Sequence, residues 1–360
     1  MNREFIQALG ELEKEKGIST DVLVEAIELA LVSAYKKNYG TADNVRVNID
    51  REEGDIDVFM RMDIVDEIED PMTQISIEEA REIDPRYEVG DAIEYQVTPK
   101  DFGRIAAQTA KQVIVQRIRE AERGMIFDDY ITRQGELITG TIQRISNDTI
   151  FVNMGKTEGI LAVTEQVAGE HYMINDRMKF YIMDVKRTSK GPQVYLSRSH
   201  PGLVRRLFEL EVAEIGEGVV EIKNVAREAG SRTKMAVSSS DENVDPVGAC
   251  VGPRGTRVQT VVDELYGEKI DIIEWNEDPR VLITNVLSPA KVESVILAED
   301  GSKAATAVVP DYQLSLAIGK EGQNVRLAAK VSGWKIDIRS HSQYFGDGIK
   351  YVEEEKNNEE

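Results

Sequence analysis

Two segments near the C-terminal end of this 360-residue chain repeat one pattern, and each contains the tetrapeptide G-x-x-G. The first segment occupies residues 245–272 and the second occupies residues 312–338. When the glycines are aligned, Gly252 matches Gly319, and both segments end in the strand-like sequence K-I-D-I. Apolar residues around each tetrapeptide recur at helical spacing, which predicts helix, loop, helix and strand. One G-x-x-G carries little information, whereas two in the same frame indicate a duplicated module.

The two glycines of each tetrapeptide suit a loop that holds a phosphate backbone. Without a Cβ atom, glycine allows a tight turn and a close approach to a ligand. The helix that begins after the loop adds free N–H groups and the positive end of its dipole. The duplicated pattern resembles the KH module, in which this loop clamps about four nucleotides of a single strand. Ordinary helix–helix turns closed by glycine caps are the alternative, and the alignment of two copies favours the binding loop.

The residues between the glycines differ between the two copies. Pro253 has no N–H to donate, whereas Arg254 offers a charged fork that suits phosphate. Glu321 is unfavourable beside phosphate, and Lys320 next to it offsets the negative charge. Each loop therefore presents one cationic side chain beside its glycines.

The length and composition indicate a multidomain globular protein. With 360 residues, of which 41% are hydrophobic and 30% charged, the chain is too long for one core and suggests two to four domains. Its one cysteine, Cys250, excludes an internal disulfide, and the three histidines lack the spacing of a zinc site. No stretch approaches the roughly 18 apolar residues of a membrane span, and the N-terminus lacks the features of a signal peptide. We therefore expect a cytoplasmic protein that uses no membrane, metal or cofactor.

The net charge of −21 is distributed unevenly along the chain. Residues 1–134 carry 17 Lys and Arg against 30 Asp and Glu, whereas residues 135–200 carry 8 against 7 and residues 276–345 carry 8 against 8. Residues 201–275 are moderately acidic, with 9 against 14. Because attraction to phosphate dominates affinity for nucleic acids, this balance predicts modest RNA binding that needs local concentration or a partner. The acidic front end predicts a partner with a basic surface.

The first 128 residues are typical of an α+β domain. Periodicity predicts, in order, a helix containing Phe5 and Leu12, a helix from Ser19 to about Gly40, strands at residues 45–50 and 55–65, and a helix at residues 102–124. Carboxylates such as Asp55 and Asp57 would suit a two-metal site. They alternate with apolar residues, however, as on the solvated face of a half-buried strand. We favour the solvated face.

From Gly135 the sequence changes to short strands separated by turn residues. Three strands precede Ala162, and two more follow at residues 180–187 and 193–198. Five short strands in about 65 residues predict an OB-fold barrel, which binds single strands by stacking bases on surface aromatics. Phe151 stands where barrels of the ribosomal S-one type carry a stacking aromatic, and burial in the core is the alternative for it. Ala162 stands where many such barrels carry a histidine, so the stacking platform stays an open question.

A helix and two strands precede each G-x-x-G segment. For the first module these are a helix at residues 200–212 and strands at 219–226 and 233–238; for the second, a helix at 281–287 and strands at 292–298 and 304–309. Together with the strand after the loop, this order is the bacterial, type II, KH topology. Because Leu287 follows Trp275 by only 12 residues, we expect the two modules to pack as one rigid unit. The composition of the tail, residues 346–360, predicts disorder.

The complete order of modules resembles the NusA family of bacterial transcription factors. The resemblance rests on an acidic front domain, an S-one barrel and two adjacent KH modules, and on local sequences. These include S-R-S-H-P-G-L-V-R-R-L-F-E-L-E-V at residues 197–212, D-P-V-G-A-C-V-G-P-R-G-T-R-V-Q at residues 245–259 and I-G-K-E-G-Q-N-V-R-L-A-A-K-V-S-G-W at residues 318–334. It covers residues 1–342 and is most specific in the KH part.

The resemblance implies a multidomain α+β fold. Its parts are an N-terminal RNA polymerase-binding domain at residues 1–128, an OB-fold RNA-binding domain at 135–199, KH domains at 201–276 and 277–345, and a disordered acidic tail at 346–360. It also implies a non-enzymatic, monomeric elongation factor that docks on RNA polymerase near the RNA exit channel and binds nascent single-stranded RNA. Such a factor modulates pausing, intrinsic termination and, with other Nus factors, antitermination. Some longer family members add acidic repeats that mask the KH surface, and we expect that form of autoinhibition to be absent.

By position, the resemblance implies RNA contacts in both loops and in the barrel. The residues are Gly252, Pro253, Arg254, Gly255 and Arg257 in the first module, Gly319, Lys320, Glu321, Gly322, Asn324 and Arg326 in the second, and Phe151 in the barrel. The resemblance implies no catalytic residue and no metal ligand.

Two other classes of protein use similar modules. Polynucleotide phosphorylase ends in KH and S-one modules, but there a single KH precedes the barrel, and the preceding catalytic domains are too large for 134 residues. A ribosome-associated RNA chaperone that never meets polymerase is the second alternative. Its whole surface should favour RNA, whereas residues 1–134 are acidic. Because the sequence shows no nucleophile–base pair, phosphate-binding loop or metal cluster, it favours a binding factor.

Overall fold

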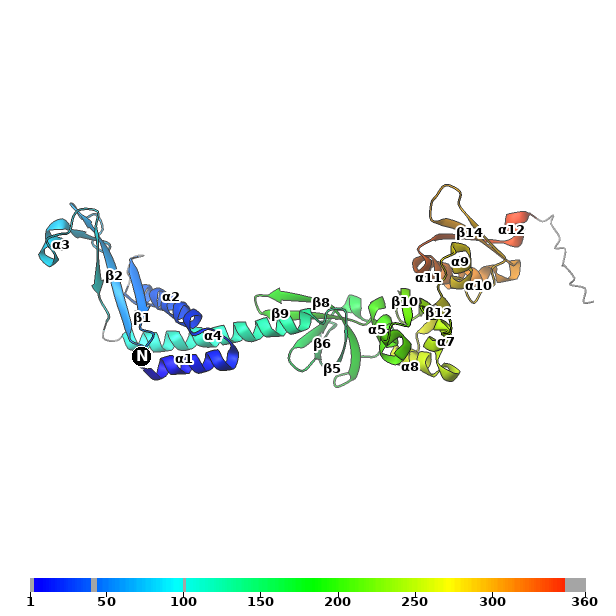
Figure 1. Ribbon diagram of the computed structural model, residues 1–360, viewed down its shortest axis with the longest axis horizontal. Coiled ribbons are helices and arrows are strands. Elements are labelled where there is room, and N and C mark those ends of the chain that lie inside the picture. The colour runs from blue at the N-terminus through cyan, green and yellow to red at the C-terminus, as the bar shows by residue number, and fades with distance from the viewer. Residues whose placement is uncertain (1–2, 40–43, 100–101, 347–360) are drawn as a thin grey trace, which may run out of the picture. The chain divides into compact units, whose positions relative to one another are not determined.

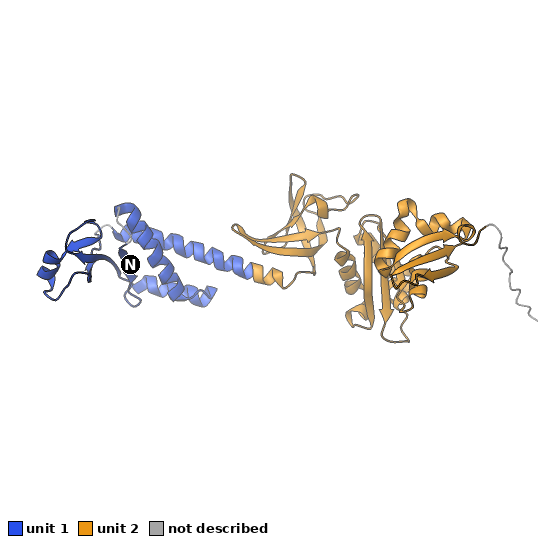
Figure 2. Cartoon of the chain, turned by 90° about the horizontal axis from the view of Figure 1, so that it is seen from above, with its two compact units in different colours: residues 1–126 blue, residues 127–360 orange. Residues whose placement is uncertain are grey.

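The computed structural model describes residues 3–39, 44–99 and 102–346, and the chain divides into two compact units (Figure 2). Unit 1 spans Met1–Ile126 and unit 2 spans Phe127–Glu360, and each is described by itself. Of the predicted features, Gly40 and the acidic tail from residue 347 lie outside the described residues. In the described part, no helix combines the length and apolarity needed to cross a bilayer.

Unit 1 consists of helices and a four-stranded sheet (Figure 1). Its elements are α1 (Arg3–Lys16), α2 (Thr20–Tyr39), β1 (Val45–Ile49), β2 (Ile56–Val65), β3 (Gln74–Ser76), α3 (Ile77–Ile83), β4 (Ala92–Gln96) and α4 (Phe102–Ile131). The long strand β2 pairs antiparallel with β1 and β4 and parallel with β3. The predicted helices and the strands β1 and β2 are confirmed, whereas β3, α3 and β4 were not predicted.

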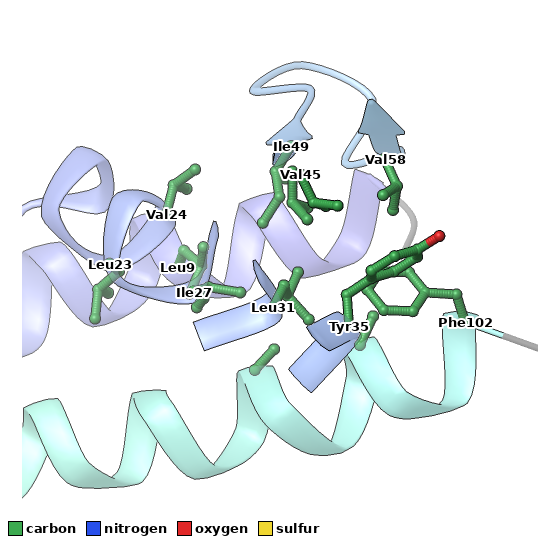
Figure 3. Packing of buried hydrophobic residues seen from close by; sticks show 13 residues of the cluster. Leu9, Leu23, Val24, Ile27, Leu31, Tyr35, Val45, Ile49, Val58 and Phe102 are labelled. Carbon is green, nitrogen blue, oxygen red and sulfur yellow. The ribbon is translucent and has the colours of Figure 1, made fainter. Parts of the chain in front are cut away.

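The core of unit 1 forms around α2 (Figure 3). Leu23, Ile27 and Leu31 lie on one face of this helix and are fully buried. They belong to one apolar cluster with residues of α1, β1 and α4. The ring of Tyr35 meets Phe102 of α4 edge-on, with 5.6 Å between the ring centroids. Unit 1 therefore has a core of its own.

Helix α4 extends beyond its predicted end. The sequence analysis ends it at Gly124, but the helix continues to Ile131, past the predicted domain boundary at residue 128. Glycine costs a helix about 1 kcal/mol relative to alanine, which is too little to end it. Tyr130 in the last turn is 2% exposed, and its hydroxyl donates a hydrogen bond to the carbonyl of Met154 at 3.3 Å. Burial against the strands that follow therefore stabilises the last two turns.

Unit 2 begins with a closed five-stranded barrel, as predicted. Its strands are β5 (Leu137–Ser146), β6 (Thr149–Asn153), β7 (Glu158–Leu161), β8 (Arg177–Thr188) and β9 (Gly191–Ser197), in the order β5-β6-β7-β9-β8. Only β7 and β9 pair in parallel. A Cβ atom on Gly159 would lie 2.5 Å from Leu196, so the side chains that fill the barrel leave space for glycine alone at this position.

Two modules with the predicted order of elements follow the barrel (Figure 1). Module 1 contains α5 (Pro201–Glu211), α6 (Ala213–Gly216), β10 (Val220–Glu228), β11 (Arg232–Ser239), α7 (Pro246–Val251), α8 (Thr256–Glu264) and β12 (Lys269–Glu274). Module 2 contains α9 (Pro279–Val286), β13 (Ser294–Leu297), β14 (Ala304–Val309), α10 (Leu314–Ile318), α11 (Gln323–Ser332), β15 (Lys335–Ser340) and α12 (His341–Phe345). In each sheet the central strand pairs antiparallel with the preceding strand and parallel with the last one.

The two modules share one apolar core. Ala226, Ala236 and Ile273 on the sheet of module 1 are at most 4% exposed. They cluster with Leu327 and Val331 of α11 and with the buried face of α9. The helices of module 2 thus cover the sheet of module 1, so the two modules pack together as predicted, while the rigidity of the pair stays a prediction.

Buried arginines connect the barrel to module 1. Arg198 follows β9 and is fully buried; its Nε and Nη2 lie 2.9 and 2.5 Å from the carboxylate of Glu170, and its Nη1 lies 3.2 Å from Glu264. Arg227 binds Glu268 through Nε and Nη2, and its Nη1 donates to the carbonyl of Arg198 at 2.7 Å. Because these buried charges are paired and hydrogen-bonded, they hold the junction in one arrangement.

Candidate nucleic-acid interface

The two G-x-x-G loops have the same backbone conformation. The φ/ψ pairs are 72°/174° at Gly252 and 77°/169° at Gly319, 55°/25° at Arg254 and 53°/27° at Glu321, and 77°/15° at Gly255 and 74°/16° at Gly322. The duplication seen in the sequence is therefore a duplication of geometry. This agreement disfavours two unrelated helix–helix turns.

The first glycine of each loop is required by the backbone and by its neighbours. A φ near +75° with an extended ψ is open essentially to glycine alone. A Cβ atom on Gly252 would lie 2.7 Å from Cγ of Arg257, and one on Gly319 would lie 2.7 Å from the backbone nitrogen of Asn324. The chain after each loop thus packs directly against the first glycine.

The tips of both loops are open to solvent. Pro253 and Arg254 are exposed in module 1, as are Lys320 and Glu321 in module 2. The N-cap residues of α8 and α11 are the glycines Gly255 and Gly322, and among the described residues no side chain accepts a hydrogen bond at either N-cap. The positive end of each helix dipole therefore faces the loop without a competing carboxylate cap. A phosphate backbone fits this combination of glycine, cation and helix end.

Two of the residues predicted to contact RNA have partners within the protein. Arg257 binds Glu214 at 2.9 Å and donates to the carbonyl of Ala249 at 2.7 Å. Asn324 is 4% exposed, and its Nδ2 donates to the carbonyls of Leu287 and Ala317, each at 3.0 Å. Through these bonds each side chain supports the shape of its loop from inside, while Oδ1 of Asn324 has no hydrogen-bond partner among the described residues. That these two side chains contact RNA stays a prediction.

Arg326 connects the loop of module 2 to module 1. Its Nη1 donates to the carbonyl of Glu321 at 2.9 Å, and its Nε binds Glu228 of β10 at 2.6 Å. The hydrogen bond from Arg326 holds the pKa of Glu228 below its usual value. Gln323 also donates to Glu228, at 2.9 Å. The sequence predicted Arg326 as an RNA contact and gave no sign of this bridge, because its partner lies 98 residues away.

A pocket of about 370 Å³ lies beside the loop of module 2. Gly319, Lys320 and Asn324 line it from module 2, and Arg232 and Lys269 line it from module 1. The two cations from module 1 were missed by the sequence analysis. No local signal marks them, because only the packing of the modules brings them to the second loop.

Phe151 lies on the outer surface of the barrel and not in its core. Its neighbours along β6, Ile150 and Val152, are at most 2% exposed, whereas Phe151 is partly exposed. The guanidinium of Arg144 covers the ring, 3.3 Å from its centroid, and also binds Glu158 at 2.9 and 3.1 Å. The core alternative is therefore excluded for Phe151. A base that stacks on this ring has to displace Arg144 or stack on the guanidinium.

The acidic strand of unit 1 forms local contacts. Asp57 accepts a hydrogen bond from Gln96 at 2.6 Å, and Asp63 lies 3.5 Å from Arg61. Among the residues that the structure describes, no three His, Cys, Asp or Glu side chains are arranged to hold a metal ion. These carboxylates lie at the surface, where each contacts a neighbouring polar or cationic side chain.

Four family models match the chain in sequence order. They describe the NusA N-terminal domain at residues 4–124, the S1 RNA binding domain at 132–197, the NusA-like first KH domain at 198–275 and the NusA-like second KH domain at 279–345. The barrel is therefore an S1 domain with the OB fold, and modules 1 and 2 are KH domains. The predicted fold class is confirmed.

Curated relatives match over nearly the whole chain. A Bacillus subtilis protein named "Transcription termination/antitermination protein NusA" is 57% identical over 359 residues, which cover 100% of this chain and 96% of that protein. Proteins of the same name from Halalkalibacterium halodurans and Mycobacterium tuberculosis are 58% and 46% identical; the matches cover 95% and 92% of this chain and 90% and 92% of those proteins. A solution structure of the N-terminal domain of NusA from B. subtilis is 63% identical and covers 34% of this chain and 99% of its own, with a TM-score of 0.31. From the matched domains and the curated relatives, we conclude that the chain belongs to the NusA family of transcription termination/antitermination proteins.

Proposed function

We propose that this chain is a transcription factor without catalytic activity that holds nascent single-stranded RNA at RNA polymerase. The two G-x-x-G loops bind the RNA backbone, and residues 1–128 dock on polymerase near the RNA exit channel. Through these contacts the factor modulates pausing, intrinsic termination and, with other Nus factors, antitermination. The names of the relatives support the termination and antitermination part.

The observation that carries the RNA part is the identical geometry of the two loops. Three of the four residues in each loop have positive φ, and for the non-glycine residues among them, Arg254 and Glu321, this conformation costs free energy and persists where surrounding contacts enforce it. Gly252 and Gly319 allow the chain to take this conformation, and Arg254 and Lys320 supply exposed charges at the loop tips. Two weak sites held in one rigid unit bind one strand more tightly than either alone.

The observation that supports docking is the surface of α2 in unit 1. Val22, Glu25 and Leu29 recur at helical spacing and are exposed, with Leu29 at 71%. An apolar side chain as exposed as this one, within an acidic domain, suits contact with a partner that is apolar at its centre and basic at its rim. Docking raises the effective concentration of the RNA sites at the exit channel, which compensates for their modest affinity.

The RNA contacts are tested by paired substitutions at the loop tips. In module 2 the pair is Lys320→Asp with Glu321→Asp, and in module 1 it is Pro253→Asp with Arg254→Asp. Aspartate tolerates the left-handed backbone of the third loop position and brings negative charge to the phosphate. We expect each pair to weaken binding of an unstructured RNA by about tenfold or more. The control, Lys303→Asp, makes the same change of charge as the module 2 pair in an exposed turn away from the loop.

Polymerase docking is tested by capture of core RNA polymerase on the immobilised full chain at several salt concentrations. We expect salt-sensitive capture that Leu29→Asp strongly reduces, with Val115→Asp, at an exposed position of α4, as the control. Capture that is unaffected by loss of residues 1–126 would place docking elsewhere. RNA binding without any capture would favour the ribosome-associated chaperone. Unchanged RNA affinity in both loop variants would remove the loops from the interface.

A further inference from the structure

The duplication makes the two KH sheets comparable position by position. Arg232 lies opposite Lys269 in module 1, as Ala304 lies opposite Lys335 in module 2, so the central strands align without a shift. The first strand of each sheet then aligns through its pairing with the central strand. On the face turned away from each module's own helices, the equivalent residues are Asn224 and Ser294, Ala226 and Ile296, and Glu228 and Ala298.

In module 1 this outer face binds helices. Ala226 is buried against the helices of module 2. Asn224 donates from Nδ2 to the carbonyls of Lys330 and Val331 at the end of α11, at 3.2 and 2.9 Å. Glu228 binds Arg326 of the same helix at 2.6 Å. The sheet face thus contacts the helix in three ways. Ala226 packs against apolar side chains, the Asn224 amide binds carbonyls at the C-terminal end of the helix, and the Glu228 carboxylate pairs with an arginine at the edge of the contact.

In module 2 the same face is open over most of its area. Ile296 is 37% exposed, and Ser294 and Ala298 are exposed as well. A groove of about 470 Å³ runs over it, between Ile296 on β13, Thr306 on β14 and Lys335 on β15. Helix α12 contacts one end of β14. Within the described residues, no other helix packs on this face, so the second copy displays a docking surface that the first copy uses.

The acidic residue at the flank of the first copy is absent from the second, whereas Lys335 has a lysine, Lys269, as its equivalent in module 1. Module 1 has Glu228, which binds an arginine, whereas module 2 has Ala298 at the equivalent position. Lys303 and Lys335 are exposed at this end of the face, where the backbone N–H of Lys335 donates to the carbonyl of Lys303 at 2.8 Å. Their ammonium groups form no ion pair with any described residue. The second face therefore suits an acidic side chain where the first binds a basic one.

We infer that the outer sheet face of module 2 binds an amphipathic α-helix of a partner protein. Small apolar side chains of that helix contact Ile296 and Thr306, and an acidic side chain at its flank pairs with Lys335 or Lys303. The described part of the face offers no aromatic ring for stacking bases, and Asp337 lies on it, so RNA is disfavoured as its ligand. Helix recognition through an apolar face at i, i+3 and i+4 is a common mode of partner binding.

The test uses two conformationally constrained helical peptides with the sequence of residues 320–334. One has the native sequence, and the other carries Arg326→Glu and Lys330→Glu. Each peptide is labelled and titrated with the full chain in a fluorescence anisotropy assay. We expect saturable binding of the charge-swapped peptide, about tenfold tighter than that of the native peptide, because only the former complements the lysines.

Variants of the full chain locate the site. Ile296→Arg should abolish binding of the charge-swapped peptide, whereas Val281→Arg, at a similarly exposed position of α9, should leave it unchanged. Ala298→Glu combined with Lys335→Glu should reverse the preference between the peptides, since it adds the carboxylate that module 1 has in Glu228 and replaces an exposed lysine with a second carboxylate. Affinity for RNA and the urea midpoint should stay unchanged in the Ala298→Glu, Lys335→Glu variant, which shows that the fold is intact.

Four outcomes would overturn the inference. One is the absence of saturable binding of either peptide up to about 1 mM, and another is binding that survives Ile296→Arg. Self-association of the chain that is lost in Ile296→Arg would identify a second copy as the occupant. Competition between RNA and the charge-swapped peptide would identify the face as an RNA surface.

Discussion

At the scale of single residues, the loops show what the sequence could and could not predict. Gly252 and Gly319 were predicted from their repeat, because only glycine adopts a φ near +75° with an extended ψ without strain. The left-handed conformation of Arg254 and Glu321 carries no sequence signal, since neither residue type favours it. The burial of Asn324 was also unpredictable, because its hydrogen-bond acceptors include the carbonyl of a residue 37 positions away.

Gly319→Ala should destabilise module 2 by about 3 kcal/mol or more, because it combines backbone strain with a Cβ only 2.7 Å from the nitrogen of Asn324. Gly333→Ala is the control: its φ is also positive, at 73°, but no atom lies within 4 Å of its Cβ. That variant should lose about 1 kcal/mol. Urea unfolding followed by tryptophan fluorescence measures both, because Trp275 and Trp334, the two tryptophans of the chain, lie in the core shared by the modules. Equal losses would show that contact with Asn324 is unimportant.

Cys250 should make module 1 less stable as the pH rises above about 9. Burial raises the pKa of its thiol to about 12 in the folded state, whereas an unfolded cysteine has a pKa of about 8.5. Between these values the unfolded chain releases a proton that the folded chain keeps, so the free energy of unfolding falls with pH. In Cys250→Ala this contribution disappears. The slopes of the free energy of unfolding against pH should therefore differ between the wild type and the variant by up to about 1.4 kcal/mol per pH unit. Parallel pH profiles from pH 8 to 11 would contradict the prediction.

At the scale of elements, strong hydrophobic periodicity was sufficient to predict a helix or strand from the sequence, and weak periodicity was not. The alternating strands and the helices with a wide apolar face were predicted within a few residues of their observed bounds. The short strand β3 and helix α3 were missed because neither has enough residues for a period to show. A local signal was nevertheless present: Ser76 caps α3 by accepting a hydrogen bond from the N–H of Glu79, in an S-x-x-E sequence typical of helix starts. The end of α4 depends on burial of Tyr130, which no local pattern reports.

Gly124→Ala should stabilise α4 by about 0.5–1 kcal/mol, because alanine is the better helix former and its Cβ would meet no atom within 4 Å. Gly103→Ala, in the first turn of the same helix and equally unobstructed, is the matched control and should have a smaller effect. Thermal unfolding followed by far-ultraviolet circular dichroism compares the two. A loss of stability in Gly124→Ala would contradict the prediction. It would show that the helix requires glycine at this point, as it would if it were bent there.

At the scale of the whole molecule, buried charges determine how the domains of unit 2 connect. Arg198 reaches Glu170 and Glu264, which lie 28 and 66 residues away in the sequence. The order of domains could be predicted because each domain has its own local pattern. The packing of the two KH domains on each other could be predicted from the short segment between them, whereas the connection of the barrel to module 1 could not, because it depends on single polar residues whose partners become neighbours only after folding.

Arg198→Met should destabilise unit 2 by about 3–5 kcal/mol at neutral pH, because it leaves the carboxylate of Glu170 buried without its cation. Adding Glu170→Leu should restore a large part of the loss, since the uncompensated charge is then removed. Urea unfolding of the wild type, both single variants and the double variant measures the coupling. A double variant as unstable as Arg198→Met would show that the loss has another origin.

The two KH domains share one core, and Arg326 of one binds Glu228 of the other. These contacts hold the two G-x-x-G loops at a set distance from each other. The spacing between the two loops is fixed by packing and does not adjust to the ligand. A strand that occupies both loops must therefore be unpaired over the length between them. A transcript that has already folded back on itself can fill one loop but not both. Under the proposed function, affinity then depends on the time that the RNA spends extended, and we expect the protein to compete with RNA folding.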